Sequence, residues 1–386
     1  MKPPPSSPRQ ASLAQAGKLE EIQLLRALAA GMVVWSHVGD WAPAAGLGDI
    51  PGTASRALGA AGVDLFFIIS GFIIARSAFG GVHRPRPAEF MLRRLLRIAP
   101  LYWLWSAVVW IWQSAAGNAF APAQVAKTFA FLPWTEGNGF VLPVLYPGWT
   151  LSYEFLFYVS VGLALLAGAR GPRWLMAVGV ALALASVVVR SPLAWLPFLA
   201  NPLWLEFCAG MVLAKFYPRL RAASPVLGAG WLGAGLAAWG ATALIAPPAL
   251  ADVAATLSNE VSALRVLGWG GGALGVMLGV VNLCQRTPRW AVALGDVSYT
   301  WYLTQAITLP VAARLWTTLA LPGGWVAFGV FAVGVTATSA VILGRAIEVP
   351  LHRWTSAWVR RRFSASSRLE RLSLPALPGN SPTFPS

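Results

Sequence analysis

Charge is scarce in this chain of 386 residues. Asp, Glu, Lys and Arg together make up 11% of the sequence, whereas soluble proteins carry about 25%. Hydrophobic residues account for 57%, and long apolar runs recur that can each cross a hydrocarbon core of ~30 Å. These proportions exclude a soluble globular protein and predict an all-α polytopic integral membrane protein.

Cysteine and histidine are also rare. The two cysteines, Cys208 and Cys284, both lie in apolar runs and offer neither a disulfide framework nor metal-ligand spacing. The sequence contains no H-E-x-x-H, P-loop, G-x-S-x-G or dinucleotide-binding glycine pattern. We therefore expect no metal and no permanently bound cofactor. The absence of an internal repeat weakens the case for a transporter built from duplicated halves.

We predict about ten transmembrane helices, so that both termini lie on the same side. Basic residues fall mainly in alternate connections, and this positive-inside pattern places the N- and C-termini in the cytoplasm. The net charge of +15 therefore reflects topology and requires no nucleic-acid partner. The predicted spans are 22–38, 58–78, 98–115, 149–169, 174–190, 199–217, 226–246, 264–284, 292–316 and 325–347. The opposite connections hold little basic charge beyond Arg56, Lys127, Arg190 and Arg265.

One membrane domain is expected between two tails. Residues 1–20 form a tail that we expect to be disordered, and residues 21–355 form the transmembrane domain. Residues 356–386 form a basic and then Pro/Ser-rich cytoplasmic tail. The apolar run 27–38 has few basic residues directly before it, so we expect it not to be cleaved as a signal peptide.

Ionisable residues inside apolar spans are costly unless they face protein or water, which makes each a functional candidate. Arg26 and His37 are eleven residues apart in the first span, on one helix face and ~16 Å apart along the axis. A neutral imidazole there can accept a proton from a hydroxyl as a general base. The alternatives are a core histidine satisfied by a neighbouring helix and an Arg26 side chain that reaches the headgroups.

Two carboxylates are candidates for orienting His37. Glu154 lies among aromatic residues in WTLSYEFLFY, and Asp64 lies in GVDLFFIISGFII, on the same face as Gly71. Either carboxylate could stabilise a charged imidazole, and Asp64 could instead tie closely packed helices together. We expect Glu206 and Glu348 to be structural, the latter in an interfacial ion pair.

Three arginines lie at the cytoplasmic mouth of the third span. In FMLRRLLRIAP, the spacing places Arg97 beside both Arg93 and Arg94 on one helix face. Three guanidinium groups there suit a phosphoester ligand, although the positive-inside rule would also explain them.

Taken together, these segments resemble the acyltransferase 3 family of bacterial integral-membrane O-acyltransferases, from about Leu24 to about Arg353. One departure is Gln305, at a position where the family usually has histidine. Glutamine can hydrogen-bond but cannot titrate near neutral pH. The motifs that carry the resemblance are Arg26 with His37, the GVDLFFIISGF segment 62–72, Arg94 with Arg97, the WTLSYEFLFY segment 149–158, LGDVSYTWYLTQ at 294–305 and IEVP at 347–350.

The resemblance implies transfer of an acyl group, expected to be acetyl, from cytoplasmic acyl-CoA to a hydroxyl of an exported or lipid-linked carbohydrate at the bacterial inner membrane. His37 would be the general base, with Glu154 or Asp64 as its partner. Arg26, Arg93, Arg94 and Arg97 would bind the CoA phosphates, and Trp149, Ser152, Tyr153 and Gln305 are expected to contact substrate.

Two other functions remain open from the sequence. One is a transporter or glycan exporter in which Arg26, His37 and Glu154 form a proton or substrate path. The other is acyl transfer to an antibiotic or a lipid. The expected partners are membrane lipids, acyl-CoA and a carbohydrate acceptor, and no pattern in the sequence specifies an oligomeric state.

Overall fold

The computed structural model describes residues 19–48, 54–81, 84–136, 139–188, 195–245 and 248–372. Nearly all of the N-terminal tail predicted at 1–20 lies outside these ranges, as do Arg190 and residues 373–386 of the predicted C-terminal tail.

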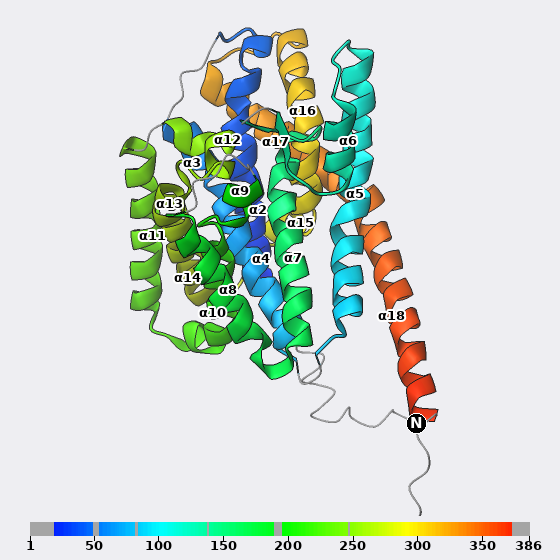
Figure 1. Ribbon diagram of the computed structural model, residues 1–386. Coiled ribbons are helices and arrows are strands. Elements are labelled where there is room, and N and C mark those ends of the chain that lie inside the picture. The colour runs from blue at the N-terminus through cyan, green and yellow to red at the C-terminus, as the bar shows by residue number, and fades with distance from the viewer. Residues whose placement is uncertain are drawn as a thin grey trace, which may run out of the picture.

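Helices make up most of the described chain and run roughly parallel in one bundle (Figure 1). The long helices are α2 (Glu20–Val38), α4 (Gly62–Phe79), α5 (Pro87–Ala115), α7 (Trp149–Leu166), α8 (Gly171–Ala185), α10 (Trp204–Ala222), α11 (Pro225–Ile245), α14 (Gly271–Leu283), α16 (Ser298–Thr318), α17 (Trp325–Leu343) and α18 (Val349–Leu372). The shorter α-helices are α3 (Ala54–Ala60), α6 (Pro122–Phe129), α9 (Trp195–Leu199), α12 (Val253–Leu257), α13 (Ser262–Arg265) and α15 (Arg289–Asp296).

Short turns and one hairpin complete the described part. The 3₁₀ turns are η1 (Gly39–Trp41), η2 (Pro43–Ala45), η3 (Tyr146–Gly148), η4 (Gly168–Arg170) and η5 (Pro248–Ala251). Two π-helical turns, η6 (Val266–Gly270) and η7 (Gly344–Glu348), join α13 to α14 and α17 to α18. Strands β1 (Trp134–Glu136) and β2 (Gly139–Val141) pair antiparallel in the connection before α7.

The ten predicted spans all coincide with helices. Eight helical stretches of the described residues are long and apolar enough to cross a membrane. Helices α8 and α16 occupy the other two predicted spans: α8 has only 15 residues, and the sequence of α16 is less apolar because it contains several threonines and a glutamine. The prediction of an all-α polytopic membrane protein is therefore confirmed. The ninth predicted span is divided, because α15 ends at Asp296 and α16 begins at Ser298.

Helix α4 packs against α10 backbone to backbone. A Cβ added to Gly71 would lie 2.2 Å from the carbonyl oxygen of Phe207, and one added to Gly210 would lie 2.1 Å from that of Ile68. Any larger side chain at either glycine would therefore force the two helices apart. The close approach predicted at Gly71 is confirmed, and it brings α4 into the centre of the bundle, where α2 and α7 also contact it.

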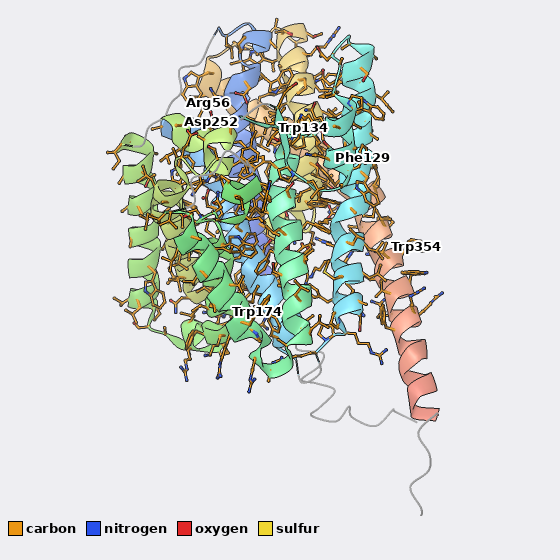
Figure 2. The ribbon with its side chains drawn as sticks, in the orientation of Figure 1. Arg56, Phe129, Trp134, Trp174, Asp252 and Trp354 are labelled. Atoms are coloured by element: carbon orange, nitrogen blue, oxygen red, sulfur yellow. The ribbon has the colours of Figure 1, made fainter. Side chains whose placement is uncertain are left out.

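One end of the bundle carries basic side chains, among them Arg76 in the last turn of α4 and Arg84 just before α5. We call it the basic end. Helix α4 finishes there and α5 begins there, at the lower end of Figure 1. The guanidinium group of Arg84 reaches the carbonyl oxygen of Gly168, so the connection before α5 lies beside the one before α8. Trp174 lies at this end, whereas Arg56, Trp134 and Asp252 lie towards the other end (Figure 2).

Helix α18 continues past the boundary that the sequence placed between residues 355 and 356. It extends as one helix to Leu372 and packs against α5. Part of the segment expected as a cytoplasmic tail is therefore a helical continuation of the bundle, and in Figure 2 Trp354 points away from it.

A buried ion pair joins α4 to α13. Asp64 and Arg265 are 0% and 1% exposed, and the guanidinium group donates through Nε and Nη2 to the two carboxylate oxygens at 3.0 and 2.7 Å. Arg265 also donates to the carbonyl oxygens of Leu250 and Ala60. The sequence named Arg265 with the outer connections, although the predicted span 264–284 includes it. In the structure it is the last residue of α13 and lies buried in the bundle.

Glu206 is buried beside this pair, and its carboxyl group interacts with that of Asp64. A second negative charge next to Asp64 is costly, whereas an amide of the same shape is neutral and can donate a hydrogen bond to Asp64. Asp64 and Glu206 should therefore respond in opposite ways to the same chemical change.

We expect Asp64→Asn to destabilise the protein, because the buried guanidinium group of Arg265 loses the carboxylate that pairs with it, at a cost of about 3–5 kcal/mol. Glu206→Gln is the matched control and should melt at or above the temperature of the wild type. Thermal unfolding of the detergent-purified protein, followed by tryptophan fluorescence, measures both. Equal loss of stability in the two variants would contradict this assignment.

Candidate active site

A cavity of about 860 Å³ lies among α2, α4, α5, α7, α16 and α18. One wall is a stripe of α4 that includes Val63, Phe66, Ser70 and Ser77. The fourteen residues from Ser77 to Val63 correspond to ~21 Å of helix, so the cavity is long and follows α4 away from the basic end.

Four arginines line the part of the cavity near the basic end: Arg84, Arg93, Arg94 and Arg97. Arg93 is already paired with Glu89, to which Nε and Nη2 donate at 2.9 and 2.6 Å. Arg94 donates to the hydroxyl of Ser77 and lies over the rings of Phe90 and Tyr158. The arginine cluster predicted from spacing is thus brought together, and Arg94 carries the less compensated charge of the two neighbours.

Arg26 lines the same cavity from α2. It donates to Gln23 at 3.4 Å, and the charges acting on it include those of Arg97, Glu348 and Glu154. Glu348 in turn accepts hydrogen bonds from the backbone and hydroxyl of Thr300 at 3.2 and 2.7 Å and lies 3.6 Å from Arg97. The ion pair expected for Glu348 is present, and it places Arg97 on the cavity wall.

Glu154 faces this cavity. Its Oε1 accepts hydrogen bonds from Ser70 at 3.0 Å and from Tyr158 at 2.5 Å. Thr150, Glu154 and Tyr158 follow at intervals of four residues on α7, and all three line the cavity. The structure therefore gives Glu154 partners other than His37.

His37 lies beyond the other end of the cavity and is absent from its lining residues. Its Nδ1 is 2.9 Å from Oδ2 of Asp40, whose second oxygen accepts from Arg56. The imidazole also contacts the ring of Tyr146, with centroids 4.7 Å apart. Arg56 can reach Asp40 because residue 39 is glycine, and a Cβ there would lie 2.4 Å from the guanidinium carbon.

Neither carboxylate that the sequence proposed as the partner of His37 contacts it. Asp64 is held by Arg265, and Glu154 by Ser70 and Tyr158. Asp40 takes that position instead. It is only three residues after His37, a spacing that puts both on one side of a helical turn, so the sequence contained the signal.

Trp149, Ser152 and Tyr153 are buried and are absent from the cavity lining. The ring of Tyr153 packs 4.3 Å from that of Phe198, and that of Trp149 packs edge-on against Phe67. Gln305 is 0% exposed and donates to the carbonyl oxygen of Tyr302 at 2.9 Å. The structure thus places all four predicted substrate contacts within packed helices.

Tyr302 and Thr150 separate the cavity from His37, and sequence reasoning assigned neither to the site. Both line the cavity, and their hydroxyl oxygens are 2.8 Å apart. Tyr302 also donates to the carbonyl oxygen of Pro147, next to Tyr146 in η3. Tyr146 interacts electrostatically with Asp40 on one side and with Tyr302 on the other.

The remaining wall comes from α18, through His352, Thr355, Ser356 and Val359. Within the described residues, no group of three or more histidine, cysteine, aspartate or glutamate side chains could hold a metal ion. The charge of the cavity is instead set by guanidinium groups, which bind phosphate through paired N–H donors.

The chain is similar to several known proteins. The chain is 32% identical over 267 residues to the exopolysaccharide production protein ExoZ of Rhizobium meliloti, which covers 67% of this chain and 78% of that protein. It is 30% identical over 154 residues to the putative membrane-bound transacylase BcsY of Komagataeibacter xylinus, covering 36% of each. Nodulation protein 10 of Rhizobium leguminosarum is 26% identical over 91% of this chain and 98% of its own length.

No solved structure matches the chain. The family model described as an acyltransferase domain (Acyl_transf_3) matches residues 19–345, which include α2 to α17 and every cavity wall except α18. The chain therefore belongs to the Acyl_transf_3 family of membrane acyltransferases.

Proposed function

We propose that this protein transfers an acyl group, acetyl in the simplest case, from acyl-CoA to a carbohydrate hydroxyl across the bacterial inner membrane. The observation that carries the proposal is the long cavity with arginines at one end and Tyr302 and Thr150, next to the His37 site, at the other. The names of ExoZ and BcsY, which refer to exopolysaccharide production and to transacylation, favour a polysaccharide acceptor.

The donor is proposed to enter from the basic end, which faces the cytoplasm under the positive-inside rule. Its 3′-phosphate and diphosphate bind Arg94, Arg97 and Arg93, and Arg26 lies farther along the cavity. The pantetheine arm extends along α4 past Ser70, and the thioester reaches the end formed by Thr150 and Tyr302. A charged head group thus stays near water while the acyl group alone crosses the apolar interior.

His37 is proposed to act as general base. It removes the proton from the acceptor hydroxyl, whose oxygen attacks the thioester carbonyl carbon. The C–O bond forms, the C–S bond breaks, and the departing CoA thiolate takes the proton from His37. Asp40 holds Nδ1 and stabilises the imidazolium, which is the role of the third member of a base-and-orienter set.

We expect His37→Gln to lower turnover of acetyl-CoA by about 10²- to 10⁴-fold without weakening acetyl-CoA binding, because the base lies outside the donor cavity. Thiol release from acetyl-CoA by the purified protein measures turnover, with water in place of the acceptor. Ser36→Ala, one residue away, is the matched control and should be fully active. Normal turnover by the His37 variant would contradict the proposed role of His37 as general base.

Asp40→Asn should reduce turnover by a factor between about 10 and 10⁴, because the amide keeps the shape of the carboxylate but cannot stabilise an imidazolium. The dissociation constant for acetyl-CoA should stay unchanged. If Asp64→Asn reduced turnover per folded protein more than Asp40→Asn, then Asp64 would be the better candidate for the orienting residue.

Arg94→Gln should weaken acetyl-CoA binding by about 10- to 100-fold, since a charged hydrogen bond is worth about 1.5–3 kcal/mol. Arg93→Gln should have a smaller effect, because Glu89 already compensates that charge. Arg173→Gln is the control for loss of basic charge at this end, because Arg173 is exposed on α8 and lies outside the cavity lining. Isothermal titration calorimetry measures the dissociation constant for acetyl-CoA of each of the three variants. Equal weakening by all three would indicate a general surface effect, and substrate counterflow without acyl-CoA consumption would indicate a transporter.

A further inference from the structure

The proposed reaction passes through a tetrahedral anion, and an apolar interior can host that charge only if hydrogen-bond donors are already in place. The donors must lie where the thioester meets the acceptor. Two buried hydroxyl groups occupy this part of the cavity, those of Tyr302 and Thr150, which are 5% and 7% exposed.

These hydroxyls form a triangle with the carbonyl oxygen of Pro147. The Tyr302 and Thr150 oxygens are 2.8 Å apart, and they lie 2.9 and 3.1 Å respectively from the carbonyl oxygen. Three close oxygen–oxygen contacts share only two hydrogens, because a carbonyl donates none. One contact at any moment therefore lacks a hydrogen of its own.

Because one donor is enough to satisfy the carbonyl oxygen of Pro147, one of the two hydroxyl hydrogens is available to a ligand. If Thr150 donates to the carbonyl oxygen of Pro147, that acceptor is satisfied, and the hydrogen of Tyr302 can turn towards another oxygen. The switch leaves no buried polar group unpaired, so the large cost of an unmade buried hydrogen bond does not arise. A tyrosine held by a single acceptor would have to give up its only bond.

The position of Tyr302 along the cavity fits the same role. Thr150 is eight residues, or ~12 Å, from Tyr158 on α7, and the ring of Tyr158 lies under Arg94. In the other direction, Tyr146 precedes Pro147 and contacts His37. The hydroxyl pair thus lies between the phosphate-binding arginines and the proposed base.

The surroundings of Tyr302 also suit a donor to an anion. Phe66 packs against its ring at 5.7 Å and 71°, so the ring is held edge to face. Because the ring is fixed in an apolar wall, only the hydroxyl hydrogen has to turn when the ligand binds, and in low dielectric its hydrogen bond to an anion is strong.

We propose that Tyr302 is a catalytic residue whose hydroxyl donates a hydrogen bond to the carbonyl oxygen of the acyl thioester, and that Thr150 is the positioning residue that frees it. This inference rests on the proposed acyl transfer. As the acceptor oxygen attacks the carbonyl carbon, the C=O electron pair moves to the carbonyl oxygen, which accepts the hydrogen bond from Tyr302. When the intermediate collapses, the pair returns, the C–S bond breaks, and the proton held by His37 goes to the CoA thiolate.

The test measures thiol release from acetyl-CoA by purified Tyr302→Phe, which removes only the hydroxyl. We expect kcat to fall by about 10²- to 10³-fold, the usual effect of deleting one oxyanion donor. The dissociation constant for acetyl-CoA should change less than twofold, because the arginines are untouched. Tyr102→Phe is the matched control, since Tyr102 is buried on α5 outside the cavity lining, and its kcat should be that of the wild type.

Substitutions of Thr150 separate positioning from packing. Thr150→Ser keeps the hydroxyl and should retain kcat within threefold, whereas Thr150→Val keeps the shape and should lose at least tenfold. Thermal melting of each variant identifies any loss of folded protein. If Thr150→Ser and Thr150→Val lost equal activity, packing alone would explain the position.

The outcomes also separate this inference from the function on which it rests. A wild-type protein that consumes no acetyl-CoA, with or without an oligosaccharide acceptor, would overturn both. Wild-type turnover that depends on His37, together with full kcat in Tyr302→Phe, would overturn the role of Tyr302 and leave the acyl transfer intact.

Discussion

A charge buried in an apolar interior must be paired, and this requirement shapes the whole molecule. Two buried ion pairs join elements far apart in the sequence: Asp64 with Arg265 ties α4 to α13, and Arg97 with Glu348 ties α5 to η7. A third, partly exposed pair of Asp40 with Arg56 ties the end of α2 to α3 and leaves Asp40 in contact with His37. Five arginines and two glutamates line the cavity, so its net charge is positive and suits an anionic ligand.

Hydropathy predicted the helices well, because twenty apolar residues in a row leave the backbone few alternatives to helix. The arginine cluster on α5 could also be predicted, since spacings of three and four define a helix face. The division of a span at Val297 and the pairing of Arg265 with Asp64 could not be predicted, because both depend on packing against distant elements. Local periodicity contains no information about such contacts.

The partner of His37 is another contact that the sequence analysis did not predict. Glu154 and Asp64 attracted attention because each is a carboxylate in an apolar run, yet each has a stronger local tie, to Ser70 and Arg265 respectively. Asp40 lies at the end of the span and therefore looked like an ordinary polar boundary. Tyr302 and Thr150 carry no charge at all. Only the arrangement of their hydroxyls around one carbonyl oxygen separates them from the many other buried hydroxyls of the bundle.

The contribution of α18 to the cavity separates the width of the cavity from its charge. The match to the family ends at residue 345, whereas His352, Thr355, Ser356 and Val359 form one wall of the cavity. The family match thus covers the arginines of the cavity and His37, while α18 closes the space beside them. A change of side-chain size on the inner face of α18 would therefore alter the width of the cavity and leave the arginines and His37 in place.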